Sequence, residues 1–223
     1  MKKHKTLEYY VTHYIKREIP KHMNLDFAFY FKEFLTNDDY RMLDIGCAID
    51  NFLANDPQHI IGVDVSKNLL KIAKTRRFNV VCADVEDGLC FKNESFDAVH
   101  ASHIIEHLDN PIFFLKECYR ILKSNELLVV ITEDFSKVYK IFYDDPTHKH
   151  PLTKVSLKKC AEEAGFKKFF VNRQFVPTGM NLLIQKGLIS LEKALAIAKI
   201  LYKLGIYKHR KGHLHWLPGS DEK

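Results

Sequence analysis

The 223-residue chain has no apolar run close to the roughly 18 residues that a membrane span requires. Residues 1–5 are mostly basic, and no stretch there resembles a signal peptide. The five cysteines are scattered and form no Cys-x-x-Cys pair, which argues against a zinc or disulfide framework. Repeats and Gly/Ser-rich linkers are also lacking. We therefore expect one cytoplasmic globular domain with reduced cysteines in or near its core.

The net charge is neither strongly positive nor strongly negative. Thirty-four basic and 28 acidic side chains give a net charge of +6. Two explanations account for this positive excess equally well. The protein has an ordinary lysine-rich surface, or it binds a partner that carries phosphate or an anionic membrane surface. The functional assignment therefore depends on motifs.

Apolar runs alternate with segments of helical spacing through the middle of the chain. This alternation predicts an α/β fold with a Rossmann-like, doubly wound, mostly parallel seven-stranded sheet. Residues 51–59 leave room for only a very short first crossover helix. The predicted strands are 41–45, 60–63, 79–83, 96–101, 126–132 and 167–175, and the predicted helices are 66–76, 111–122 and 154–164. Asp109 or Asn110 is expected to cap the second of these helices, and Gly165 to close the third.

The flanking regions elaborate this single domain. Residues 1–39 are expected to form a helical cap with helices at 6–19 and 22–36, and residues 40–175 a cofactor-binding core. A helical insertion over 176–209 precedes the last strand and tail, residues 210–223. Within that tail, 213–217 alternates like an antiparallel strand.

Three acidic residues end three successive predicted strands: Asp44, Asp64 and Asp84. Ligands of such sheets bind at the carboxyl ends of the strands, where these side chains gather. Asp64 is placed to accept hydrogen bonds from two ribose hydroxyls, and Asp84 from an adenine amino group. Gly46 allows a ligand to approach the backbone closely. The pattern predicts a cofactor that contains a nucleoside.

These residues, together with Phe96-Asp97 at the fourth strand, resemble the class I S-adenosylmethionine-dependent methyltransferases. Within them the chain resembles the type 11 group, which includes methyltransferases of cell-surface glycans and sugars. The resemblance covers about residues 40–175. It implies that the loop after the first strand holds the methionine moiety of S-adenosylmethionine. The implied cofactor contacts are Asp44, Gly46, Cys47, Ala48, Asp64, Val65, Asp84, Val85 and His103.

The loop departs from the family pattern at Ala48 and Asp50, which stand where glycines are usual. Alanine adds only a methyl group, and Asp50 is expected to cap the short first helix. A nicotinamide dehydrogenase would need Gly-x-Gly-x-x-Gly here, and only the first glycine is present. S-adenosylmethionine therefore fits better than a nicotinamide cofactor.

Two histidines are candidates for the catalytic group. His103 and His107 lie four residues apart and would share a face if this segment is helical. His107 is the first candidate for a base that faces the acceptor, although a packing or capping role near Asp109 is an alternative. No Asn-Pro-Pro-Tyr-like sequence follows the fourth strand, which argues against methylation of planar amino groups on nucleic acid.

The second catalytic candidate, His148, belongs to Asp145-Pro146-Thr147-His148. This segment resembles an Asp-Pro-x-His sequence of glycan methyltransferases, and its loop is expected to overhang the cofactor pocket. A structural loop is the alternative. Carboxylates near His148 and His150 also suit a divalent metal, but nothing fixes a ligand geometry. No metal site is predicted.

The preferred function is O-methylation of a sugar, a glycan or another small metabolite. Residues 188–206 have a basic amphipathic pattern, which suits peripheral membrane contact or a helix that covers the substrate pocket. The alternatives are an RNA methyltransferase and a non-catalytic binding or scaffold protein. The sequence does not indicate an oligomeric state.

Overall fold

The computed structural model describes residues 31, 34–35, 38–49, 52–173, 183, 188–190, 193, 196–197 and 213–217. The N-terminal helices predicted at 6–19 and 22–36 lie almost entirely outside these residues. The same holds for most of the predicted insertion at 176–209, for the basic helix predicted at 188–206, and for the proposed cap Asp50.

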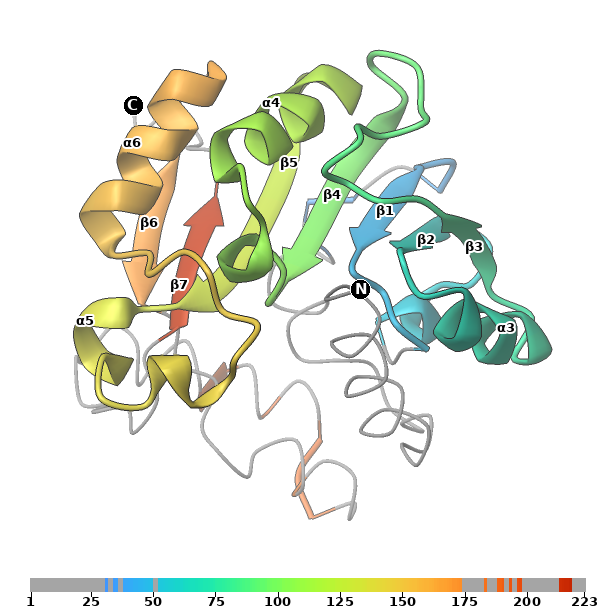
Figure 1. Ribbon diagram of the computed structural model, residues 1–223. Coiled ribbons are helices and arrows are strands. Elements are labelled where there is room, and N and C mark those ends of the chain that lie inside the picture. Colours follow the sequence, from blue (N-terminus) through green and yellow to red (C-terminus); the bar gives the residue numbers. More distant parts are fainter. Residues whose placement is uncertain are drawn as a thin grey trace.

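Seven strands form one sheet in the order β3-β2-β1-β4-β5-β7-β6 (Figure 1). The first five pair in parallel, whereas β7 runs antiparallel to both β5 and β6. The predicted doubly wound sheet and its antiparallel last strand are therefore confirmed. The strands are β1 (Met42–Ile45), β2 (Ile60–Asp64), β3 (Asn79–Cys82), β4 (Phe96–Ser102), β5 (Leu122–Glu133), β6 (Phe170–Arg173) and β7 (His213–Leu217).

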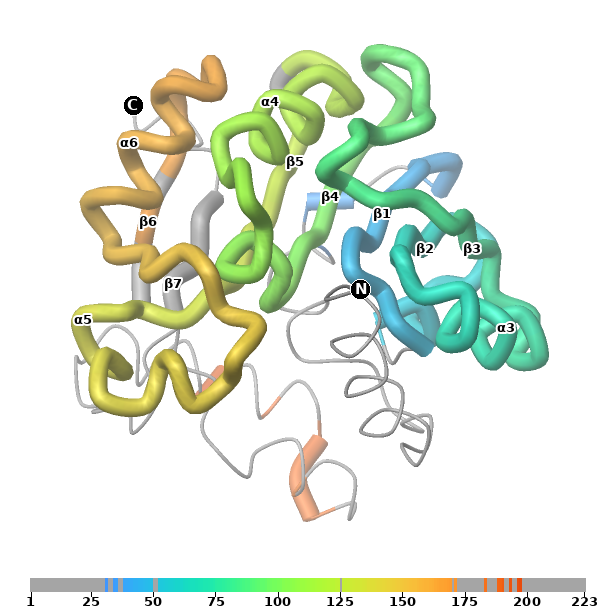
Figure 2. Tube along the Cα trace, in the orientation of Figure 1, coloured from blue at the N-terminus to red at the C-terminus, as the bar shows by residue number. Residues whose placement is uncertain are grey.

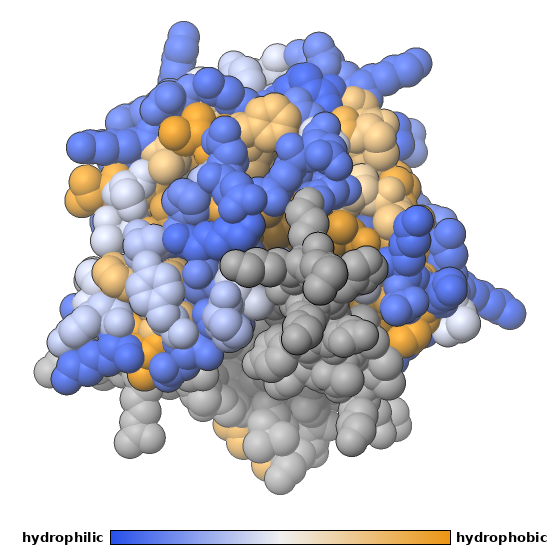
Figure 3. Space-filling view, in the orientation of Figure 1, coloured by the Kyte–Doolittle hydropathy of each residue, from blue (hydrophilic) through white to orange (hydrophobic). Residues whose placement is uncertain are grey.

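Helices cover both faces of this sheet. The helices are α3 (Lys67–Thr75), α4 (Pro111–Ile121), α5 (Phe135–Val138) and α6 (Lys154–Ala164), with short 3-10 turns η1 (Leu53–Asn55), η2 (Ile105–His107) and η3 (Phe142–Asp144). Apolar residues of α4 and α6 share one core cluster with the sheet, and Leu70 and Ala73 of α3 belong to a second cluster. The trace in Figure 2 runs outward from β1 to β3 and then returns to β4. The face seen in Figure 3 is largely hydrophilic, with small apolar patches between polar side chains.

Capping residues set the helix ends as the sequence predicts. The Asn110 side chain accepts a hydrogen bond from the Phe113 N–H at 2.9 Å, and Pro111 occupies the first turn of α4. Thr153 and Ser156 form a capping box at the start of α6. Gly165 closes that helix with a φ of 105°, a left-handed conformation that favours glycine.

Two predictions about the core need correction. Among the described residues, the connection from β1 to β2 holds only the three-residue turn η1, so the first crossover is even shorter than expected. Cys47 and Cys118 are buried and Cys160 is half-buried, but Cys82 and Cys90 are exposed. Cys82 is the last residue of the edge strand β3 and Cys90 lies in the segment that follows it, so the prediction that every cysteine lies in or near the core is wrong for these two. Within the described part of the chain, no helix is long and apolar enough to cross a membrane.

Close packing between the loop after β1 and strand β2 leaves no room for a side chain at Gly62. A Cβ there would lie 2.6 Å from Cys47 Sγ and 3.0 Å from Leu53 Cδ1. We expect Gly62→Ala to lower the free energy of unfolding by about 1–3 kcal/mol, because both neighbours are buried. Urea denaturation measures this loss. The Cys47→Ala/Gly62→Ala double variant should recover part of it, and an unchanged midpoint in Gly62→Ala would contradict the packing.

Candidate functional site

The strand order reverses between β1 and β4, so their carboxyl ends form the switch point where ligands of doubly wound sheets bind. The loop after β1, the loop after β2 and the turn η2 after β4 all leave the sheet at this edge. The predicted cofactor and catalytic residues lie on β1 and β2, in these segments, and in the loops after β3 and β5. The fold therefore places at one edge residues that lie more than 100 positions apart.

A buried carboxyl–imidazole pair joins β1 to β4 beneath the candidate site. Asp44 on β1 and His100 on β4 are register partners in the sheet, and Asp44 Oδ1 lies 2.7 Å from His100 Nδ1. The His100 ring stacks on Phe52 with centroids 3.9 Å apart, and its buried Nε2 has no hydrogen-bond partner among the residues that the structure describes. Burial raises the pKa of the Asp44 carboxyl, and the imidazole offsets only part of that rise. Asp44 is thus buried against His100, at the point where the loop after β1 begins.

The loop after β1 is tied to Asp64, at the end of β2. Asp64 Oδ2 accepts a hydrogen bond from the Ala48 N–H at 2.9 Å, and Oδ1 accepts one from the Ser66 N–H at 2.8 Å. Gly46 has a φ of 74° and Ala48 a φ of 49°. Ala48 is therefore in the left-handed region, which explains why glycine suits this position better. Burial raises the Asp64 pKa, although backbone N–H groups oppose it.

The remaining predicted cofactor contacts lie in the segments that follow β1, β2 and β3. Asp84 is half-buried after β3, and its Oδ1 accepts a hydrogen bond from the Glu86 N–H at 3.1 Å. Val65 is 48% exposed, whereas the side chains of Cys47 and Val85 are buried in the two core clusters. For Cys47 and Val85, only backbone contact with a ligand is compatible with this packing.

The 3-10 turn η2 covers only Ile105–His107 and His103 precedes it, so the condition under which His103 and His107 would share a helical face is not met. Instead, His103 Nδ1 lies 3.1 Å from Oε1 of Glu106, whose Oε2 accepts a hydrogen bond from Thr132 Oγ1 at 3.0 Å. Glu106 is 1% exposed. Burial favours its neutral form, but its histidine neighbours outweigh burial and lower the Glu106 pKa. His103 has a φ of 53° and remains 43% exposed at the edge.

The two catalytic candidates meet although 41 positions separate them. The rings of His107 and His148 have centroids 4.7 Å apart. Nδ1 of His107 lies 2.8 Å from Thr147 Oγ1, and Nδ1 of His148 lies 2.6 Å from the carbonyl oxygen of Phe142. Burial lowers the pKa of His107, which favours a neutral imidazole near pH 7.

Three potential metal ligands also meet here. Donor atoms of Glu106, His107 and His148 lie within 4.8 Å of one another. Both carboxylate oxygens of Glu106 already have partners in His103 and Thr132, so an ion would have to displace established hydrogen bonds. We assign no metal to this cluster, and the absence of a metal site stays a prediction.

Sequence reasoning missed the supporting residues of the site. His100 carried no assigned role, and Thr147 and Asp145 were seen only as part of a polar loop. The Asp44–His100 pair does have a signal in the sequence, because each of two apolar strands contains one buried polar residue. For Thr147 and Asp145 the signal was weaker, since an Asp-Pro turn fixes the loop but not its partner.

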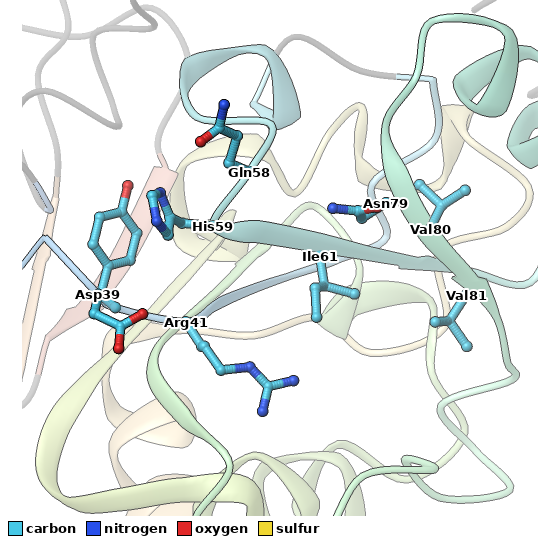
Figure 4. Close-up of a pocket in the computed structure, with 9 residues that line it drawn as sticks. Asp39, Arg41, Gln58, His59, Ile61, Asn79, Val80 and Val81 are labelled. Atoms are coloured by element: carbon cyan, nitrogen blue, oxygen red, sulfur yellow. The ribbon is translucent and has the colours of Figure 1, made fainter.

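A surface cavity of about 560 Å³ lies at the opposite edge, beside the amino ends of β1, β2 and β3. Figure 4 shows Arg41, Ile61 and Val81 projecting to one side of the sheet there, with Asn79 nearby. This cavity contains none of the predicted site residues. We therefore place the functional site at the carboxyl edge, where the candidate residues converge.

Comparisons with known proteins agree with this geometry. The profile of a family described as a methyltransferase domain matches residues 43–130, from β1 into β5. An uncharacterized protein of Methanocaldococcus jannaschii is 33% identical over 135 residues, 57% of this chain and 64% of that protein. The mitochondrial ubiquinone biosynthesis O-methyltransferase of Rattus norvegicus is 29% identical over 104 residues, 41% of this chain and 30% of that protein. The chain spans less than two thirds of either curated relative.

Solved structures give the same fold over more of the chain. A SAM-dependent methyltransferase from Archaeoglobus fulgidus has a TM-score of 0.62 and 26% identity, covering 87% of this chain and 90% of that chain. A possible histamine N-methyltransferase from Thermotoga maritima has a TM-score of 0.58 and 26% identity, covering 78% and 86%. Residues 43–130 match a methyltransferase domain, and the fold is that of the solved methyltransferases. In sequence and in fold, the chain is similar to S-adenosylmethionine-dependent methyltransferases.

Proposed function

We propose that the protein binds S-adenosylmethionine at the carboxyl edge of β1, β2 and β4 and methylates a hydroxyl group of a small molecule. The observation that carries the proposal is the position of Asp64. Its two oxygens each accept one backbone hydrogen bond, from Ala48 and Ser66, and a carboxylate has further lone pairs for two ribose hydroxyls.

The surrounding residues fit the rest of the cofactor. Asp84 supplies an acceptor for an adenine amino group beyond the end of β3. A Cβ at Gly46 would lie 3.3 Å from Ile104 Cδ1, so a larger residue would crowd the space between the loop and the turn after β4. Held by Asp64, Asp84 and the loop at Gly46, S-adenosylmethionine would supply a methyl group activated by its sulfonium centre.

The chain's own contribution is to hold the acceptor in line and to remove its proton. We assign proton removal to His107, because burial keeps its imidazole neutral and because it lies at the edge that holds Asp64. The hydroxyl proton passes to Nε2 of His107 as the oxygen attacks. His148 packs beside this ring and is placed to orient the same hydroxyl.

A hydroxyl acceptor is favoured by the similarity to ubiquinone biosynthesis O-methyltransferases, which covers about half of this chain or less. Within that class, the Asp-Pro-x-His resemblance favours a sugar, a glycan or another small metabolite. Contact with a membrane surface through the basic segment 188–206 would suit a lipid-linked acceptor and remains part of the proposal.

Transfer of labelled methyl groups tests the acceptor class. The protein is incubated with methyl-labelled cofactor and with separate glycan, small-metabolite and RNA fractions, and Asp64→Ala serves as the background. We expect label in the glycan or small-metabolite fraction, in a bond that withstands base as an ether does. Label in RNA alone, or in no fraction while the cofactor binds, would contradict the proposed acceptor.

A further inference from the structure

We propose that Asp145 and Thr147 position His107 as the base by fixing which of its nitrogens carries the proton. This inference deepens the proposed function and rests on it. Thr147 Oγ1 is 2.6 Å from Asp145 Oδ1 and 2.8 Å from His107 Nδ1, so one hydroxyl joins the carboxylate to the ring. Both residues act through His107 and are positioning residues.

The direction of each hydrogen bond follows from counting protons. A threonine hydroxyl has one proton, and an ionised carboxylate only accepts. The Thr147 proton therefore points to Asp145, and the hydroxyl oxygen accepts the N–H of His107 Nδ1. In the neutral ring the remaining lone pair is then on Nε2, the atom that a base needs. Without Asp145, the hydroxyl is able to turn and donate to Nδ1, which places the ring proton on Nε2 instead.

The chain holds this hydroxyl in place from several sides. Asp145 Oδ1 also accepts a hydrogen bond from the Thr147 N–H at 2.9 Å, which closes a tight turn at Pro146. The N–H groups of Lys149 and His150 donate to the Glu106 carbonyl oxygen at 2.8 and 2.9 Å. These hydrogen bonds fix the loop after β5 to η2, and they hold Thr147 next to His107.

A second contact repeats the arrangement at His148. A carbonyl oxygen only accepts, so the 2.6 Å contact with Phe142 O places the proton of a neutral His148 on Nδ1. The two adjacent rings then both carry their lone pairs on Nε2. Glu106, His148 and Asp145 are the charged or titratable groups that act on His107. The negative charges of Glu106 and Asp145 stabilise the imidazolium that proton uptake creates.

Long-range proton–nitrogen NMR of protein labelled at histidine nitrogens tests the inference directly, with the His107 signals assigned by their loss in His107→Gln. We expect wild-type His107 to be protonated on Nδ1 at a pH where the ring is neutral. Thr147→Val removes the acceptor and should shift the tautomer ratio about five- to tenfold toward the Nε2-protonated form. Asp145→Ala should shift it in the same direction, whereas Thr147→Ser should retain the wild-type pattern.

The outcomes separate this inference from the proposed function, because the NMR signals require neither cofactor nor acceptor. Calorimetry with S-adenosylmethionine should give affinities within about twofold of wild type in all three variants, which also confirms folding. A wild-type ring protonated on Nε2, or identical patterns in Thr147→Val and Thr147→Ser, would overturn the positioning role. Titration with Co²⁺ tests the alternative that the two rings bind a metal. A visible absorption band that appears in wild type and is lost in both His107→Gln and His148→Gln would show that both rings are metal ligands, and would likewise overturn the positioning role.

Discussion

Asp64→Ala is expected to weaken S-adenosylmethionine binding by more than about 100-fold. The ionised carboxylate would accept hydrogen bonds from two ribose hydroxyls, and a hydrogen bond to a charged group contributes about 1.5–3 kcal/mol. Two such bonds amount to at least about 3 kcal/mol, and each 1.4 kcal/mol is a factor of ten in affinity. The variant also releases the Ala48 and Ser66 N–H groups, so the loop after β1 loses its tie to β2. Isothermal titration calorimetry measures the loss.

Asp87→Ala is the matched control for this variant. Asp87 is an exposed carboxylate in the loop after β3, and its removal changes the net charge by the same amount. We expect its cofactor affinity to stay within about twofold of wild type. If Asp64→Ala bound as tightly as Asp87→Ala, the assignment of Asp64 to the ribose would be wrong.

The second large effect concerns stability. We expect His100→Phe to lower the free energy of unfolding by about 3–5 kcal/mol, because it leaves the carboxylate of Asp44 buried without its partner. Phenylalanine keeps an aromatic ring beside Phe52, so the loss reports the contact between the Asp44 carboxyl group and the imidazole and not the packing. Urea denaturation at neutral pH measures it.

The pH dependence of this loss identifies its cause. Burial already raises the Asp44 pKa, and removing the imidazole raises it further. The penalty should therefore shrink as the pH falls through the raised pKa and the carboxyl group takes up a proton. Asp44→Asn/His100→Phe should recover part of the stability at neutral pH. A loss independent of pH would contradict an unpaired buried charge.

The sheet and its helices could be predicted from the sequence because local rules agree there with the global fold. The apolar run that ends at Asp64 and the capped helix α6 each have strong local signals, and their observed bounds differ little from the predicted ones. Three acids at strand ends place the cofactor edge because parallel strands must end together.

The supporting contacts could not be predicted because they depend on how distant segments meet. Asp44 contacts His100 only because β1 and β4 are neighbours in a particular register. Thr147 reaches His107 across 40 positions only because the loop after β5 folds back onto η2. The sequence identified His107 and His148 as separate candidates, and the structure brings them together.

Calorimetric titration of the wild-type protein with S-adenosylmethionine and with its demethylated product, S-adenosylhomocysteine, decides whether the cofactor binds. We expect one binding site, a dissociation constant below about 1 mM for each ligand, and competition between the product and the methyl donor. If neither ligand gave a measurable heat of binding at millimolar concentration, the proposed function would be contradicted and only the fold of a methyltransferase would stand.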